Sequence, residues 1–253
     1  MSFDSLAPHY RWLELLTAGE LLQQCRTRFV DRTRHARRVL LLGEGIGRFL
    51  AVFRRVNPRA SVTCVDSSAV MIQLAQRRLK HGGHETAHVE WIHADALGWK
   101  PPREPFDLVA THFFLDCFRQ EQIDRLTTCI ASRISPGGLW LVSDFRLPDS
   151  GLARLRARCI VTFLYQAFRF FAALRASRLP DSDMALNRCG LRLVQREVFN
   201  FGLLHSDVWV KDEAAPFHSP PGHSFGTQPE RSGLRGVDNW RQIPHLQTWD
   251  SRV

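Results

Sequence analysis

Residues 37–53, RRVLLLGEGIGRFLAVF, constrain the fold of this chain more than any other stretch. The apolar run Val39–Leu42 is typical of a buried strand, and residues 46–56 are typical of a helix that stops at Asn57-Pro58. The glycines between them let the backbone turn tightly and let a ligand approach beside a helix N-terminus. The stretch therefore predicts a strand, a ligand-binding turn and a helix.

The alternation of strand and helix continues through residue 145. The spacing predicts further strands over 61–65, 88–94, 106–114 and 139–145, helices over 68–83 and 120–134, and a turn at 135–138. This order is typical of an α/β fold with a doubly wound, mostly parallel sheet.

The pattern changes after Pro148. Residues 152–178 are typical of a long helix, and residues 190–210 alternate like a pair of strands that would bring the sheet to seven, with antiparallel pairing at its edge. We expect one domain over 1–210, with an N-terminal helical lid over 1–36 and a helical cap insert over 149–185. Residues 211–253 are rich in Pro, Gly, Ser and His, and we expect a disordered tail.

Composition limits where the chain works and what it binds. The 44% apolar share of 253 residues is enough for one sizeable core. No secretory signal or transmembrane segment is expected, and the cysteines form no C-x-x-C pair or metal-like cluster with histidine. These features predict a cytoplasmic protein with reduced thiols and no metal site. The six cysteines are Cys25, Cys64, Cys117, Cys129, Cys159 and Cys189.

The net charge of +9 is concentrated in part on residues 152–178, which hold six arginines and no acidic residue. A basic helix of this kind suits an acidic substrate, a membrane surface or a nucleic acid. The alternative is that these arginines simply face solvent.

The glycine spacing excludes two common nucleotide loops. Gly43, Gly45 and Gly47 would need a glycine at position 48 for the dinucleotide motif G-x-G-x-x-G, and Arg48 stands there. No G-K-[ST] follows, so a P-loop is excluded as well. The class of cofactor must therefore be read from residues further along the chain.

Two acidic residues follow the next two predicted strands. Asp66 ends the second strand, where a carboxylate can accept hydrogen bonds from the two ribose hydroxyls of a nucleotide. Asp95 ends the third strand and is placed to accept a bond from an adenine amino group. The alternative for each is a helix N-cap, but both fall at the carboxyl ends of parallel strands together with the glycine loop.

Residues 37–145 resemble the core of a class I S-adenosylmethionine-dependent methyltransferase, through VLLLGEGIGRF, VTCVDSSAVMIQLAQ, WIHADAL, FDLVATHFFLDCF and SPGGLWLVSDF. The resemblance implies that the glycines line the methionine part of S-adenosylmethionine, Asp66 binds its ribose, Met71 packs on adenine, and Asp95 with Ala96 recognises the adenine edge. Many members of the family carry an acid where this chain has Leu41, and we expect Glu44 to take over part of that role. The implied cofactor-binding residues are Gly43, Glu44, Gly45, Gly47, Asp66, Ser67, Met71, Asp95, Ala96 and His112.

The loop after the fourth strand, THFFLDCF, bears on the methyl acceptor. It lacks the Asn/Asp-Pro-Pro-aromatic motif with which familiar nucleic-acid amino methyltransferases grip a base, so nucleic acid is possible but not favoured. His112 and Asp116 could work as a general base and its orienting carboxylate. Alternatively, His112 packs under the cofactor and Asp116 caps the next helix. His205 is a second candidate base.

The N-terminal FDSLAPHYRW is similar to the opening of quinone methyltransferases, and Tyr10 could close over the sulfonium. Aromatic residues at 163–171, with Arg169, could roof an apolar pocket, although ordinary core packing is the alternative. Phe113 and Trp209 are further candidates for contact with the acceptor. The sequence thus predicts methyl transfer to a small-molecule acceptor, possibly aromatic, quinone-like or lipid-like, and leaves the oligomeric state open. The alternatives are an RNA or protein methyltransferase and a non-catalytic binding module with the same fold.

Overall fold

The structure is a computed structural model that describes residues 19–84, 86–148, 150–172 and 179–213. All of these belong to the first of two compact units into which the chain divides, Met1–Phe217. The second unit, His218–Val253, lies outside the described residues, as do Tyr10 and the other N-terminal residues through 18.

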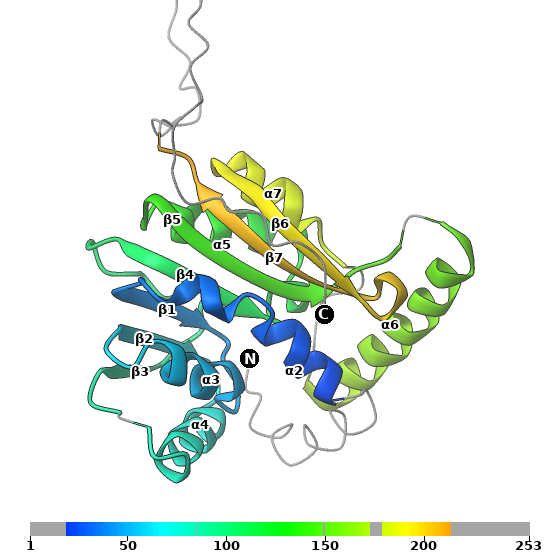
Figure 1. Cartoon of the computed structure of the whole chain (residues 1–253). Helices are drawn as coiled ribbons and strands as arrows, with labels where there is room; N and C mark the ends of the chain where they lie inside the picture. The colour runs from blue at the N-terminus through cyan, green and yellow to red at the C-terminus, as the bar shows by residue number, and fades with distance from the viewer. Residues whose placement is uncertain (1–18, 85, 149, 173–178, 214–253) are drawn as a thin grey trace, which may run out of the picture. The chain divides into compact units, whose positions relative to one another are not determined.

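The described unit is built on a seven-stranded sheet with the order β3-β2-β1-β4-β5-β7-β6 (Figure 1). Neighbouring strands from β3 to β5 pair in parallel, and β7 is antiparallel to both of its neighbours. The predicted doubly wound, mostly parallel sheet is confirmed, including the antiparallel pair at its edge. The strands are β1 (Arg38–Leu42), β2 (Ser61–Asp66), β3 (Val89–His93), β4 (Phe106–His112), β5 (Ile134–Phe145), β6 (Leu191–Phe199) and β7 (Leu204–Lys211).

Helices cover both faces of the sheet. The helices are α2 (Gly19–Thr27), α3 (Arg48–Val56), α4 (Ala69–His81), α5 (Gln120–Ala131), α6 (Gly151–Ala172) and α7 (Ser182–Arg188), with short 3-10 turns η1 (Val30–Thr33), η2 (Leu115–Cys117) and η3 (Asn200–Gly202). Side chains of η1, α3 and α4 pack on one face, and those of α5 and α7 pack on the other.

Strand β1 shows why the central strands have continuous apolar sequences. Val39 and Leu41 point into the core under α3, whereas Leu40 and Leu42 point into the core under α5. Successive side chains of a strand alternate between faces, so a strand covered on both faces needs apolar residues at every position. Each of these four side chains is at most 1% exposed.

The turn expected at 135–138 is wrong. These residues lie inside β5, whose register against β4 jumps from Phe106↔Ile134 to Leu108↔Leu139. The extra residues form an irregular bulge in which Gly137 has a φ of +72°. Pro and Gly mark a break in the ladder here, but pairing resumes on the same neighbour, so the chain does not reverse.

Two predicted boundaries also differ. The insert proposed for 149–185 would end inside α7, yet α7 packs against α5 and β6 and belongs to the helical layer of the sheet. Residues 211 and 212, where the expected tail begins, are still bonded to the rest of the fold, since Lys211 pairs with Leu191 and the Asp212 N–H donates to the Gly190 carbonyl oxygen over 3.1 Å. Residues 214–253 lie outside the described part.

Candidate functional site

The glycine loop after β1 turns three times through the left-handed region. Gly43, Gly45 and Gly47 have φ values of +65°, +64° and +77°. A Cβ at Gly47 would lie 2.9 Å from the Ala75 backbone in α4, and one at Gly43 would overlap the Phe114 ring. A Cβ at Gly45 would meet no atom within 4 Å, so the loop keeps open space on that side.

Glu44 sits inside this loop and faces the start of α3. Its Oε1 accepts a hydrogen bond from the Leu50 N–H over 2.9 Å, at the helix N-terminus where backbone donors lack intrahelical partners. Burial raises the pKa of Glu44 to about 7, and the bond from Leu50 and the charge of Arg26 partly oppose that rise. A carboxyl with such a pKa changes charge when a cation approaches.

Asp66, at the end of β2, links the glycine loop to α4. Its Oδ2 accepts from the Gly45 N–H and its Oδ1 from the Ser68 N–H, each over 3.0 Å. Burial raises the pKa of Asp66, and these two backbone bonds oppose the rise. Each carboxylate oxygen has a second lone pair, so the group can hold the loop and accept from a ligand's hydroxyls at once.

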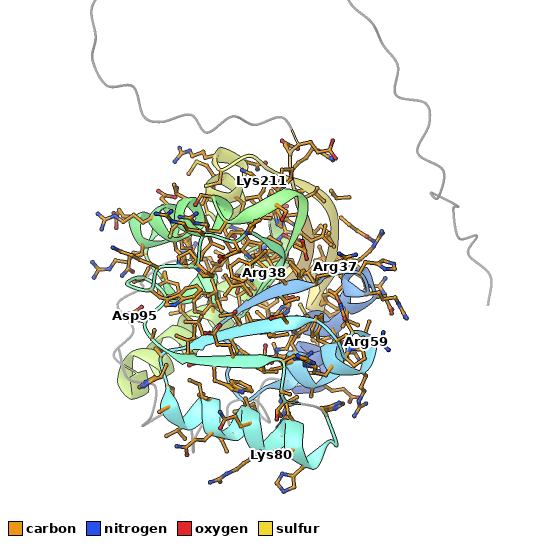
Figure 2. All side chains as sticks on the ribbon, turned by 90° about the vertical axis from the view of Figure 1, so that its left-hand side faces the viewer. Arg37, Arg38, Arg59, Lys80, Asp95 and Lys211 are labelled. Carbon is orange, nitrogen blue, oxygen red and sulfur yellow. The ribbon has the colours of Figure 1, made fainter. Side chains whose placement is uncertain are left out.

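An apolar wall and an exposed acid stand beside Asp66. Met71 and Ile46 are buried together against Leu74, and Ala96 is buried in the neighbouring core. The exposed Asp95 accepts a bond from the Leu97 N–H over 3.0 Å. Figure 2 shows Asp95 beyond the end of the strands opposite to the end that carries Arg37 and Arg59, which is the carboxyl edge shared with the glycine loop. Ser67 lies between Asp66 and the N-cap of α4.

Arg26 of α2 is a buried cation that sequence reasoning missed. It is 7% exposed, its Nη1 donates to Gln23 over 3.1 Å, and its guanidinium carbon lies 5.1 Å from the centre of the Phe113 ring. Its charge acts on both Glu44 and His112. The only sequence signal was a basic residue in a predicted amphipathic helix, which usually faces solvent.

The chain leaves β4 through a strained residue. Phe113 has a φ of +54°, which is costly for a residue with a side chain, and its N–H donates to the Ser143 carbonyl oxygen over 2.6 Å. Asp144 Oδ1 then accepts from the Phe114 N–H over 3.0 Å. These two bonds fix the loop between β4 and η2 against the end of β5.

His112, the last residue of β4, is held by Ser143. The two are joined by a 3.0 Å bond between Nδ1 and Oγ, and Ser143 Oγ also donates to the Cys25 carbonyl oxygen over 3.2 Å. Because that bond uses the one serine proton, His112 donates through Nδ1 and carries its lone pair on Nε2. Nε2 is buried without a hydrogen-bond partner among the described residues, and burial lowers the pKa of His112.

Asp116 was expected to orient His112, but Ser143 bonds its Nδ1 instead. The turn at Phe113 carries Asp116 into η2, where its Oδ1 accepts a weak bond from the Cys117 thiol over 3.5 Å. Burial raises the pKa of Asp116 to about 6, and the charge of His205 opposes the rise.

Strand β7 brings a second histidine to this edge. His205 pairs with Asp144 across β5 and β7, and its Nδ1 lies 2.9 Å from Asp207 Oδ2. The fully buried Asp207 also accepts two bonds from Arg196, over 2.8 and 2.6 Å, which help to lower its pKa. Within the described part of the chain Asp144 has no such cation, so burial raises its pKa well above the usual range, and its Oδ2 has no hydrogen-bond partner there.

Of the other candidates, one falls in the core and two lie outside the described part of the structure. Trp209 is 1% exposed and pairs with Trp140 in the middle of the sheet. It belongs to the core, where it is not exposed to an acceptor. The reason is the antiparallel direction of β7, which moves away from the carboxyl edge after His205. Tyr10 and the side chain of Arg169, with the aromatic side chains at 163–171, lie outside what the structure describes.

Comparisons with known proteins agree with this arrangement. A family model described as "Methyltransferase domain" matches residues 39–138. Residues 39–138 of this chain are therefore similar to a methyltransferase domain. A comparison with curated proteins gives no match.

Solved structures similar to this chain include N- and O-methyltransferases. The N-methyltransferase NodS from Bradyrhizobium japonicum, solved with S-adenosyl-L-homocysteine, is 15% identical with a TM-score of 0.55 over 75% of this chain and 85% of its own. The mitomycin 7-O-methyltransferase MmcR is 18% identical with a TM-score of 0.62 over 83% of this chain. An O-methyltransferase family 2 protein from Planctomyces limnophilus, in complex with apigenin, is 20% identical with a TM-score of 0.60 over 79% of this chain. This chain spans 61% of each of the two O-methyltransferases. At these identities the likeness shows the fold.

Proposed function

We propose that this methyltransferase transfers a methyl group from S-adenosylmethionine to a small-molecule acceptor at the carboxyl edge of the sheet. The observation that carries the proposal is the glycine loop, in which Gly45 is open on its Cβ side and its N–H is held by Asp66. This loop would allow a ligand to lie close to its backbone, with the Asp66 carboxylate beside it.

The remaining residues at this edge fit the parts of that cofactor. Asp66 would accept from the ribose hydroxyls, Met71 with Ala96 would pack on adenine, and Asp95 would accept from the adenine amino group. Ser67 would line the ribose side and His112 the floor of the site. The acidic Glu44 and the buried cation Arg26 suit the two charges of the methionine part, its ammonium and its carboxylate respectively.

The bound cofactor would supply an electrophilic methyl group on a sulfonium, so the protein's task is to position the acceptor and remove its proton. In O-methylation the acceptor oxygen forms a bond to the methyl carbon while the carbon–sulfur bond breaks and its electron pair stays on sulfur. The acceptor proton would pass to His112 Nε2, which carries a lone pair and has no hydrogen-bond partner among the described residues. The lowered pKa keeps this imidazole neutral at pH 7 and able to accept.

His205, Asp116 and Phe113 would form the acceptor side of the site. His205 is a second candidate base; its Nδ1 lies 2.9 Å from Asp207 Oδ2 without the geometry of a hydrogen bond. The half-buried Phe113 ring supplies an apolar surface for a planar acceptor. One similar O-methyltransferase was solved with apigenin, a phenol, so an aromatic hydroxyl is the first acceptor class to try.

Calorimetric titration with S-adenosylmethionine and S-adenosylhomocysteine tests the cofactor half of the proposal. Binding at micromolar levels is expected, and no binding by a folded sample would leave the non-catalytic binding module. Transfer of labelled methyl to a panel of phenols, quinols and amines then tests the acceptor half. Label found only in added RNA or protein would reject a small-molecule acceptor in favour of an RNA or protein methyltransferase.

A further inference from the structure

Three large apolar side chains of α6 and η3, outside the proposed cofactor site, are exposed to solvent. Leu152 and Leu155 of α6 are 85% and 62% exposed, and Phe201 of η3 is 82% exposed. The opposite face of α6 is ordinary core, because Ala157 and Val161 are buried. Helical spacing therefore puts the two leucines on the outer side of a helix that is already packed.

The turn that carries Phe201 is fixed in a costly conformation. Asn200 and Phe201 have φ values of +50° and +54°, which favour glycine, and Gly202 follows at +92°. Arg156 of α6 holds the turn, since its Nη2 donates to Asn200 Oδ1 over 3.0 Å and its guanidinium carbon lies 5.6 Å from the centre of the Phe201 ring. A strained turn tied to α6 thus keeps an aromatic ring pointing outward.

The surroundings of these side chains are positive. Arg154, Arg156 and Arg158 are all exposed on α6, and the sequence from 152 to 178 contains six arginines and no acidic residue. Figure 1 shows η3, the turn between β6 and β7, beside α6, and the two elements are in contact. Apolar and basic side chains therefore share one surface, which we call the α6–η3 surface: Leu152, Leu155, Arg156, Arg158 and Phe201.

We propose that the α6–η3 surface docks the protein on anionic phospholipid membranes. Lipid headgroups attract the arginines, and exposed Leu and Phe side chains gain by entering the boundary between headgroups and acyl chains. A nucleic acid would satisfy the arginines but would leave the two leucines in water. Docking is peripheral, because among the described residues no helix is both long and apolar enough to cross a bilayer.

The test is sedimentation of the full chain with vesicles of phosphatidylcholine alone or with about 30 mol% phosphatidylglycerol. We expect binding to the anionic vesicles only, weakened between about 50 and 500 mM NaCl. The variant Leu152→Ser/Leu155→Ser/Phe201→Ser should lose at least about tenfold in partitioning. Arg158→Glu should lose about fivefold or more.

Matched control variants distinguish specific binding through the α6–η3 surface from non-specific adsorption of the protein to vesicles. Val194→Ser/Met184→Ser removes two other exposed apolar side chains, and Arg59→Glu reverses an exposed charge at the amino edge of the strands. Both should bind vesicles like the wild type.

Several outcomes would overturn the inference: equal binding to neutral vesicles, unchanged binding of the triple variant, or a preference for an RNA oligonucleotide that this variant retains. S-adenosylhomocysteine binding, measured on the same samples, reports separately on the proposed function.

Discussion

Replacing Glu44 by Gln tests how the cofactor's ammonium is held when the family acid is absent at Leu41. In the proposed complex the Glu44 carboxylate binds that ammonium while its Oε1 keeps the bond from the Leu50 N–H. A charge-assisted hydrogen bond of this kind contributes about 1.5–3 kcal/mol, so Glu44→Gln should weaken S-adenosylhomocysteine binding by about 10–100-fold at pH 8. Isothermal titration calorimetry measures the difference.

The pH dependence adds a second signature. In the free protein the pKa of Glu44 is raised to about 7, so below that pH binding must first remove a proton. Wild-type affinity should therefore fall by about tenfold between pH 8 and pH 6, whereas the affinity of Glu44→Gln should change less. Stability should move the other way: the raised pKa makes ionisation costly in the folded state, so wild-type stability declines as pH rises from about 4.5 to 7 and then levels off. The loss is at most about 3 kcal/mol, smaller in Glu44→Gln, and urea unfolding at pH 5 and 8 checks it.

Glu121→Gln is the matched control, because Glu121 also lies beside a helix N-terminus, in the first turn of α5, but is exposed there. It should leave both profiles unchanged. If Glu44→Gln binds S-adenosylhomocysteine at pH 8 as tightly as the wild type, Glu44 serves only the N-terminus of α3 and the ammonium is held by other groups.

Three further sets of variants test the frame of the site. Asp66→Ala removes the acceptor of the Gly45 N–H and of the proposed ribose bonds, and should cost about 2–4 kcal/mol of cofactor affinity by calorimetry. Gly47→Ala should lower the free energy of unfolding by about 1–3 kcal/mol in urea, and Gly45→Ala by less, because only the Cβ at Gly47 meets another backbone. Arg196→Leu leaves Asp207 without its cation and should cost about 3–5 kcal/mol of stability, much of which Arg196→Leu/Asp207→Asn recovers; equal losses in the two would contradict this.

The mostly parallel class of the sheet could be predicted because its strands are apolar on both faces. The segment Val39–Leu42 and its successors alternate with helices, and that alternation leaves few topologies. The bulge at 135–138 could not be predicted, since Pro and Gly announce a break in local pairing without saying whether the chain reverses. The burial of Trp209 could not be predicted for a related reason. The alternation of apolar and polar residues indicates which face of the sheet a side chain occupies, whereas its burial depends on the strand register that pairs it with Trp140.

The cofactor side of the candidate site was easier to predict than the acceptor side. Loops after β1, β2 and β3 follow strands recognisable from sequence, and parallel strands bring their carboxyl ends to one edge. Arg26, Ser143 and Asp144 come from a helix before the sheet and from inside β5, where a polar residue in an apolar strand gives no hint of its partners. Their roles depend on contacts between separate segments of the chain, from Phe114 and Asp144, which are 30 residues apart, to Ser143 and Cys25, which are 118 residues apart.

Leu41 shows that a family pattern cannot be restored one residue at a time. Its side chain is 1% exposed in the core under α3, beside Phe49 and Cys64. A carboxylate there would be buried without a cation, so Leu41→Asp should destabilise the protein by about 3–5 kcal/mol in urea unfolding and should not improve cofactor affinity. A stable Leu41→Asp variant with tighter S-adenosylhomocysteine binding would show that the acid can reach the ligand from this position. The expected result instead assigns the acidic function to Glu44, which the N-terminus of α3 holds in the loop.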